Sequence, residues 1–305
     1  MDNCLFNETI TDRRSWENYS QSGALMPLIK HIYETNHINF GEVSSIPETF
    51  GIFQVGNTVI KLFHPPEAKL GHESFYQTEL SAINFCKNLA VLTPDIICTN
   101  IIHDGRYSFP YIVMVYVEGI EASKVISTYD KKAKIEFSLK LKEITDKIHI
   151  PTNIDIPRYD DSEKINSELW NRMPEPFREE RTQYLAKIKF PEPVFQHGDL
   201  WDRNVFIDKH NRLVLIDFAE SLIAPSYYDI GPMILNGGYD SIRLKTYLGD
   251  YKNDAFYDTF TTAWLLNWFG AVFISWRAKE MGIDFKSITS VNALRDMVIK
   301  SFENK

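Results

Sequence analysis

The chain has 305 residues, of which 44% are hydrophobic and 24% are charged, so it is long enough for two lobes with a sizeable core. Its net charge of −8 argues against a nucleic-acid partner, because phosphate backbones are bound by clusters of Lys and Arg. The same charge is compatible with a cationic small substrate and equally with charge kept for solubility. The chain has three cysteines and no Cys-x-x-Cys pair, which argues against a disulfide framework or a structural zinc site. No signal-peptide pattern is seen at the start, so we expect a cytoplasmic protein.

The first part of the chain predicts a helix followed by an antiparallel group of strands. Residues 24–35 place apolar side chains at helical spacing. Three strands are expected after it, at residues 38–43, 50–55 and 58–63. Residues 44–49 connect the first two, and Gly56-Asn57 is a two-residue hairpin signal between the second and the third.

Lys61 stands inside the apolar third strand, where a solvent-facing lysine would also be unremarkable. A helix is predicted at residues 71–89, and Glu79 lies close to its apolar stripe. Because burying an unpaired charge is costly, a carboxylate there needs a cationic partner, and Lys61 is the natural candidate. Glu73, earlier in the same helix, is the competing carboxylate.

Strands and then helices are expected over the middle of the chain. Residues 101–104 and 111–117 predict two strands, the second of them continuously apolar as a buried strand should be. A helix is expected at residues 135–148, and residues 151–157 form a proline-rich linker. Residues 162–189 are charged and predicted to be helical.

The most informative segment, residues 196–218, predicts a loop, a tight hairpin and a second loop. Val205–Asp208 and residues 213–216 are strand-like, and the polar residues 209–212 form the turn between them. An antiparallel hairpin brings the residue before its first strand next to the residue after its second, which here means Asn204 and Asp217. Asp199 lies just upstream. Two hard oxygen ligands beside a carboxylate suit Mg²⁺ with a phosphate-bearing partner.

The last third predicts helices rich in aromatic residues. Asp250, Asp254 and Asp258 recur at four-residue steps, so one side of a helix would carry them. Such a row could bind an amine-rich substrate, although a solvated helix face is the favoured interpretation. Residues 260–276 are strongly apolar but short of the ~20 residues that span a membrane, and Asn267 interrupts them. We expect a buried helix there and no membrane partner.

These motifs resemble a known family. Residues 197–204, His-Gly-Asp-Leu-Trp-Asp-Arg-Asn, resemble the kinase catalytic loop, and residues 217–219, Asp-Phe-Ala, resemble its Asp-Phe-Gly. Gly198 replaces the arginine of protein kinases and Ala219 replaces their glycine. In this form the segment is similar to the aminoglycoside phosphotransferase family of small-molecule kinases. The implied fold is α+β and bilobal, like a protein kinase.

The resemblance implies where the two lobes lie. Residues 1–117 would form an N-terminal nucleotide-binding lobe, an antiparallel sheet with one main helix. Residues 118–305 would form a larger, mainly helical lobe that carries the catalytic and substrate-binding residues. An aspartate similar to Asp229 ties the catalytic segments together in the family, and His149 is expected to be a packed, structural histidine.

The resemblance also implies roles for the residues of the hairpin and the third strand. Asp199 would be the catalytic base or would orient the substrate hydroxyl, and Asn204 and Asp217 would hold Mg²⁺. Val59-Ile60-Lys61 is similar to the kinase Val-Ala-Ile-Lys, so Lys61 would contact the α- and β-phosphates. Glu79 fits the family's helix better than Glu73 and would pair with Lys61.

Four further nucleotide contacts are implied by position alone. Residues 44–49 occupy the place of the glycine-rich phosphate loop but lack its glycines, so the hydroxyls of Ser45 and Thr49 would face the phosphates. The backbone of Val115 and Val117 would bond the edge of adenine at the hinge between the lobes. The missing Gly-x-Gly-x-x-Gly pattern favours a small-molecule kinase over a protein kinase.

The implied activity is transfer of the γ-phosphate of ATP, or of GTP, to a hydroxyl of a small molecule with the help of Mg²⁺. By resemblance the preferred acceptor is a cationic molecule, an aminoglycoside-like antibiotic, so that the enzyme would confer resistance. The alternative is a metabolic kinase that acts on choline, methylthioribose, homoserine or a fructosamine. A nucleotide-binding pseudokinase is less favoured, because Lys61, Asp199, Asn204 and Asp217 are all present. The protein would be a monomer or a homodimer.

Overall fold

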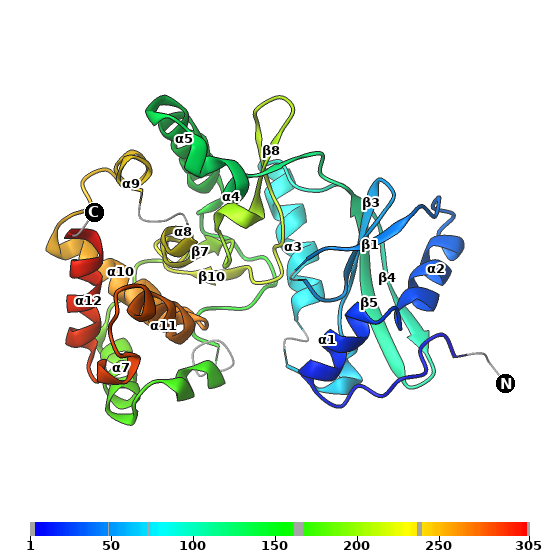
Figure 1. Cartoon of the computed structure of the whole chain (residues 1–305), viewed down its shortest axis with the longest axis horizontal. Helices are drawn as coiled ribbons and strands as arrows, with labels where there is room; N and C mark the ends of the chain where they lie inside the picture. The colour runs from blue at the N-terminus through cyan, green and yellow to red at the C-terminus, as the bar shows by residue number, and fades with distance from the viewer. Residues whose placement is uncertain (1–3, 48, 72–73, 162–166, 237–239, 304–305) are drawn as a thin grey trace. The chain divides into compact units, whose positions relative to one another are not determined.

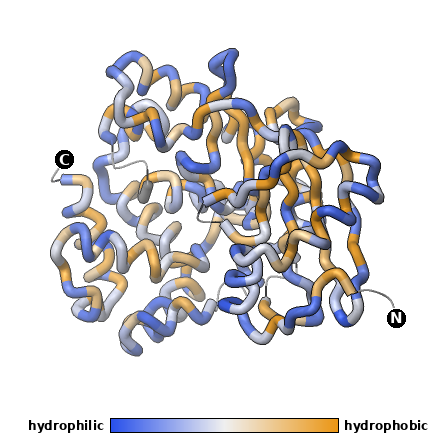
Figure 2. The backbone as a smooth tube through the Cα atoms, turned by 45° about the vertical axis from the view of Figure 1, so that its right-hand side comes forward, coloured by the Kyte–Doolittle hydropathy of each residue, from blue (hydrophilic) through white to orange (hydrophobic). Residues whose placement is uncertain are grey.

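The computed structural model describes residues 4–47, 49–71, 74–161, 167–236 and 240–303 (Figure 1). The chain divides into two compact units. The first consists of Met1–Leu80 and Thr93–Glu118, and the second consists of Ser81–Leu92 and Gly119–Lys305. Figure 2 shows hydrophobic and hydrophilic stretches alternating along the backbone.

The first unit is built on an antiparallel sheet of five strands in the order β1-β2-β3-β5-β4. The strands are β1 (Val43–Ser45), β2 (Ile52–Val55), β3 (Thr58–Leu62), β4 (Ile96–Asp104) and β5 (Tyr107–Val115). Gly56, between β2 and β3, has φ +58°, as the predicted hairpin turn requires. The sheet and its central hairpin therefore agree with the pattern of the sequence.

The first strand was predicted in the wrong place. Residues 38–42 form no strand, and β1 pairs with β2 from Val43 opposite Val55 to Ser45 opposite Phe53. The reason is that β2 ends at the turn, so the residues before Val43 have no strand beside them. A Cβ added at Gly41 would lie 2.8 Å from the Cα of Gly56, which shows how closely the chain passes that turn.

Helices cover both faces of this sheet. The helices α1 (Arg13–Gln21) and α2 (Met26–Thr35) pack their buried side chains, such as Trp16 and Leu28, against Ile60 and Phe109 of the sheet. The start of α3 (Phe75–Asn88) packs against a second cluster on the sheet, formed by Phe63, Ile112 and Met114. The short 3₁₀ turn η1 (Pro66–Ala68) precedes α3.

The second unit contains two small sheets and most of the helices. One sheet has the order β6-β8-β9, formed by β6 (Gly119–Glu121), β8 (Val205–Asp208) and β9 (Leu213–Leu215). The other pairs β7 (Val194–Gln196) with β10 (Leu222–Ala224). The helices and 3₁₀ turns are α4 (Ala122–Val125), η2 (Ile126–Thr128), α5 (Lys131–Ile148), η3 (Glu168–Arg172), α7 (Glu175–Lys187), η4 (Asp202–Asn204), α8 (Ile230–Asn236), α9 (Ser241–Leu248), α10 (Asp254–Leu266), α11 (Gly270–Glu280), η5 (Phe285–Ser287) and α12 (Val291–Glu303).

The apolar segment 260–276 is mostly buried as predicted, although Trp276 at its end is exposed, and it forms parts of two helices instead of one. Helix α10 ends at Leu266, and the side chain of Asn267 accepts a hydrogen bond from Phe269 N at 2.9 Å. Helix α11 then begins at Gly270, where a Cβ would lie 1.9 Å from the carbonyl oxygen of Trp264. Within the described ranges, no helix combines the length and the apolar character that crossing a membrane requires.

The predicted acidic row is also different in the structure. Asp250 precedes α10, so only Asp254 and Asp258 share that helix. Arg295 of α12 contacts both carboxylates, at 2.8 and 2.5 Å. These two aspartates therefore tie α10 to α12, which explains their spacing without a ligand.

Candidate active site

The hairpin β8–β9 sets the geometry of the site. Val205 lies opposite Leu215, and Ile216 N donates to Asn204 O at 3.0 Å, which extends the ladder by one bond. Asn204 and Asp217 therefore flank the open end of the hairpin, as predicted. Asp217 has φ +62°, a left-handed conformation that is uncommon for residues other than glycine and tolerated by Asp.

The turn between Asp199 and Asn204 closes on itself. Trp201 N donates to Asp199 O at 3.1 Å, and Asn204 N donates to Trp201 O at 2.9 Å. The side-chain amide of Asn204 donates to Asp199 O at 2.8 Å and to Asp199 Oδ2 at 2.9 Å. Because Nδ2 is used in this way, Oδ1 is the atom of Asn204 that remains to face a cation.

Asp199 lies in an environment that disfavours its charged form. Burial, together with the negative charges of Asp217 and Glu220, raises the pKa of Asp199 to about 7, although the hydrogen bond from Asn204 opposes the shift. A carboxyl group that titrates near neutrality can accept a proton from a hydroxyl and release it again. A cation placed among these carboxylates would lower that pKa and stabilise the ionised form.

Asp229 holds the segment that leads into the turn. Its carboxylate accepts from His197 N and from Gly198 N, both at 2.8 Å, and its own N–H donates to Gln196 Oε1 at 3.1 Å. His149 Nε2 lies 3.1 Å from Asp229 Oδ2. Asp229 thus ties residues 196–198 to the start of α8, and His149 is packed against it.

Gly198 is required by the backbone at this point. It has φ +88°, and a Cβ there would lie 2.0 Å from Glu220 O. An L-residue would be strained by that φ and would also clash with the chain that follows Asp217. The glycine that distinguishes this loop from protein kinases therefore has a steric cause in this chain.

In the first unit, the structure brings together the predicted cation and carboxylate. Lys61 of β3 donates through Nζ to Glu79 Oε2 of α3, and both residues are buried. The predicted pair is thus present, and the competitor Glu73 lies outside the described residues. A buried Lys–Glu pair of this kind fixes the direction of the ammonium group.

The four nucleotide contacts that were expected from position alone differ in exposure and in hydrogen bonding. Ser45 is exposed at the end of β1, not in the connection, and Thr49 donates its hydroxyl hydrogen to Ile46 O at 2.8 Å. Val115, the last residue of β5, donates its N–H to Asp95 O at 2.8 Å, so that group is already used within the sheet. Val117 lies beyond the strand and is partly buried.

One feature of the site had no signal in the sequence. Asp202, inside the turn, forms a buried ion pair with Arg243 of α9. The two residues are 41 positions apart, and neither belongs to a periodic or motif pattern that would have linked them. Only the folded chain, in which α9 packs against α5, reveals the pair.

A metal ion would find oxygen donors here and not a dense ligand cage. Across the described part of the chain, no three His, Cys, Asp or Glu side chains come together as metal ligands. The amide oxygen of Asn204 and the carboxylate of Asp217 are the hard donors at the hairpin. Such a sparse set suits Mg²⁺, which keeps several waters and takes further oxygens from phosphate.

Comparison with known proteins gives a family match over most of the chain. The model of the phosphotransferase enzyme family matches residues 55–268. An aminoglycoside 3'-phosphotransferase of Acinetobacter baumannii is 33% identical over 88 residues. That alignment covers 28% of this chain and 30% of the relative, so the chain spans less than a third of the protein it matches.

Solved structures resemble the chain over nearly its whole length. The GDP complex of aminoglycoside 2'-phosphotransferase-IIIa has a TM-score of 0.62 at 15% identity, with 92% of this chain and 98% of that one covered. The choline kinase LicA from Streptococcus pneumoniae has a TM-score of 0.57 at 18% identity, with 91% and 98% covered. At these identities the likeness shows the fold. The predicted α+β, protein-kinase-like fold is confirmed.

Proposed function

The chain belongs to the phosphotransferase enzyme family, and from this premise we propose that it transfers the γ-phosphate of ATP to a hydroxyl of a small cationic molecule. An aminoglycoside-like antibiotic is the preferred acceptor. Support for a kinase-type phosphotransferase comes from the family match and from the fold shared with enzymes solved as nucleotide complexes.

The observation that carries the proposal is the closed turn between Asp199 and Asn204 beside Asp217. The amide of Asn204 fixes one carboxylate oxygen of Asp199, and the raised pKa of Asp199 suits it to accept the proton of an acceptor hydroxyl. In phosphoryl transfer the protein mostly positions groups and stabilises charge, so a rigid turn with a basic carboxylate is the arrangement needed.

We assign Mg²⁺ to Asn204 and Asp217, because the chemistry of the two donors fits a hard cation. When bound, the ion would neutralise charge on the phosphate chain. Lys61 would bind the α- and β-phosphates, and Glu79 would keep its ammonium group in place. Ser45, Thr49, Val115 and Val117 remain proposed nucleotide contacts. Because the N–H of Val115 is bonded within the sheet, its carbonyl oxygen is the group that we assign to adenine.

The acidic surroundings of Asp199 favour a cationic acceptor. The negative charges of Asp217 and Glu220 both raise the pKa of Asp199, and Glu220, to which we assign no metal ion, would keep its charge when Mg²⁺ is bound. An ammonium group of the acceptor would relieve this repulsion. An aminoglycoside has several such groups, and the partial relative is named for acting on this class.

Choline is the second candidate acceptor, and the same charge argument supports it. It carries one quaternary ammonium group near its hydroxyl, and a choline kinase shares the fold. The two candidates differ in size and charge number. A panel that includes kanamycin, hygromycin B, choline and an uncharged sugar therefore separates them.

The test is to incubate the purified protein with ATP or GTP, Mg²⁺ and each acceptor, and to search the products by mass spectrometry for one added phosphate. We expect a phosphorylated aminoglycoside with the wild type and none with Asp199→Asn, which keeps the shape of the side chain. Phosphorylated choline alone would establish the second candidate. Release of ADP without any phosphorylated acceptor would contradict both.

A further inference from the structure

We propose that Arg243 is a positioning residue for phosphoryl transfer, acting through Asp202 to hold the turn that carries Asn204. This inference rests on the proposed function, because the turn matters for catalysis only if Asp199 and Asn204 act in the reaction. Arg243 lies on α9, outside the catalytic motifs.

The contact between Arg243 and Asp202 is bidentate and buried. Arg243 Nη1 donates to Asp202 Oδ2 at 2.8 Å, and Nη2 donates to Oδ1 at 2.7 Å. The exposed fractions of the two side chains are 9% and 2%. A planar guanidinium that meets both carboxylate oxygens fixes the orientation of that carboxylate as well as its place.

Asp202 transmits this orientation to the site because the turn is short. It is the first residue of η4, which ends at Asn204. Trp201 and Asn204, on either side of Asp202, make the backbone bonds that close the turn onto Asp199. Rotation of Asp202 would therefore shift the amide of Asn204 and with it the carboxylate of Asp199.

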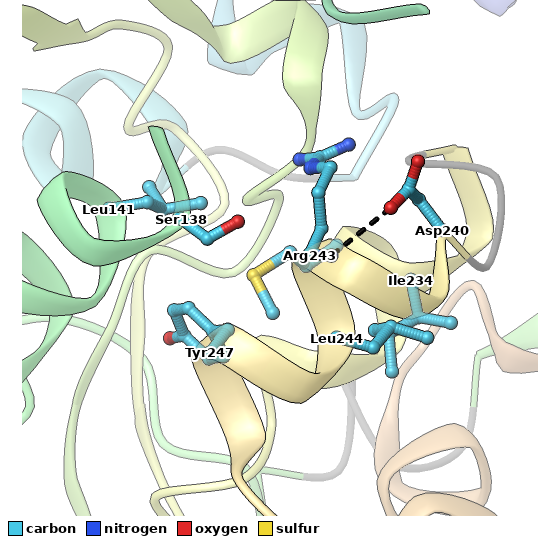
Figure 3. Close-up of a pocket in the computed structure, with 8 residues that line it drawn as sticks. Ser138, Leu141, Ile234, Asp240, Arg243, Leu244 and Tyr247 are labelled. Carbon is cyan, nitrogen blue, oxygen red and sulfur yellow. Dashed lines mark hydrogen bonds between the residues drawn. The ribbon is translucent and has the colours of Figure 1, made fainter. Parts of the chain in front are cut away.

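Helix α9, which carries Arg243, is also joined to α5 by contacts that do not involve the turn. Asp240 caps α9 by accepting from Arg243 N at 3.1 Å, and Lys134 of α5 forms an ion pair with Asp240 at 2.6 Å. The guanidinium of Arg243 lies 5.1 Å from the ring centroid of Phe137, also on α5. Figure 3 shows Arg243 on α9 with its guanidinium directed away from Leu244 and Tyr247.

The cavity beside these residues is too small to hold a substrate. It lies between α5 and α9, is lined by Ser138, Leu141 and Tyr247 among others, and has a volume of about 20 Å³ (Figure 3). That space holds about one water molecule and no substrate. The buried charge of Arg243 is therefore directed at Asp202 and not at a ligand in this cavity.

The competing explanation is that the ion pair only stabilises the fold, and a matched pair of variants separates the two. Arg243→Lys keeps a positive charge but cannot donate the two parallel hydrogen bonds that the guanidinium makes to both oxygens of Asp202. Lys134→Met breaks the neighbouring ion pair with Asp240, which joins the same two helices without contacting the turn. Both variants should melt at a lower temperature than the wild type.

Only Arg243→Lys should lose turnover. We expect its kcat to fall on the order of 10- to 100-fold, the range caused by small misplacements of reacting groups, while its KM for the nucleotide stays within about twofold. Lys134→Met should keep its kcat. Adding Arg243→Lys to Asp202→Asn should cause little further loss, because the two residues act through one contact.

Hydrogen exchange gives a readout that needs no substrate. Peptides that cover residues 199–204 should exchange faster in Arg243→Lys than in the wild type or Lys134→Met. Equal loss of kcat in both variants, or unchanged kcat and exchange in Arg243→Lys, would overturn the proposal. If the wild type phosphorylates no acceptor, the proposed function fails, and the exchange of the turn still decides whether Arg243 holds it.

Discussion

Replacing Asp229 by alanine should lower the stability of the fold strongly, because its carboxylate is a buried acceptor. The fully buried carboxylate accepts the N–H groups of His197 and Gly198 at 2.8 Å each and lies 3.1 Å from His149 Nε2. In Asp229→Ala both N–H groups stay buried without an acceptor, which costs about 1–3 kcal/mol each.

The loss of one partner from a buried charged network costs about 3–5 kcal/mol in comparable cases. We therefore expect Asp229→Ala to lower the free energy of unfolding by about 3–5 kcal/mol, a large part of the ~5–15 kcal/mol that stabilises most proteins. Urea unfolding followed by tryptophan fluorescence measures this difference. Asp229→Asn should lose less, because one amide oxygen can still accept one of the two N–H groups.

Asp146→Ala is the control for removal of a carboxylate as such. Its carboxylate is exposed and pairs with Lys142 within α5, so it should cost under about 0.5 kcal/mol. A loss below about 1 kcal/mol for Asp229→Ala, or a loss equal to that of the control, would refute the reasoning from buried acceptors.

The same network predicts a pH dependence. Burial acts to raise the pKa of Asp229, but the hydrogen bond and the charge of His149, with the N–H of Gly198, hold that pKa below its usual value. A group with a lowered pKa in the folded state stabilises the fold above its unfolded pKa, about 4, and this stabilisation is lost as the pH falls. The difference between wild type and Asp229→Ala should thus be full at neutral pH and shrink below about pH 4.

Three further changes test other parts of the structure. Glu79→Gln removes the charge that orients Lys61. Nucleotide affinity, measured by calorimetry, should therefore fall on the order of tenfold. An unchanged Kd would speak against the role of Lys61. Gly198→Ala should cost at least about 1–2 kcal/mol and slow turnover, whereas Gly249→Ala, also at positive φ but with open space around it, should cost only the backbone strain. Arg295→Ala should cost under about 1 kcal/mol, and the loss should disappear in 1 M salt if the pairs with α10 are the cause.

The sequence predicted those parts of the site that are local in the chain. Asn204 and Asp217 flank a hairpin with a short turn, so their neighbourhood follows from strand pairing alone. The cost of a buried charge predicted a partner for Lys61 on the following helix, and the resemblance to the family favoured Glu79 over Glu73. In both cases a regular element fixes the direction of the side chain, and the pattern of the sequence reports that element.

The features that were missed depend on packing between distant segments. Arg243 meets Asp202 because α9 packs on α5, and no local pattern encodes that contact. Asn267 was visible as a polar residue inside the apolar run, but the run did not show that a helix ends there, since that end depends on the close approach of Gly270 to Trp264. The position of the first strand was predicted wrongly, because the length of its partner strand β2, and not its own composition, limits where it can pair.

The ring of His197 lies between the backbone near Asp199 and the backbone near Asp217, and so affects the distance between them. Burial lowers the pKa of His197, so the imidazole is neutral. Its Nε2 lies 3.0 Å from Ile216 O, and since a carbonyl oxygen only accepts, the single ring proton resides on Nε2. Nδ1 then presents a lone pair to Asp199 N at 3.3 Å. The imidazole, held in one tautomer, thus sets the distance between the two backbone segments that lead to Asp199 and to Asp217. A second ring proton would repel the N–H of Asp199 and increase that distance.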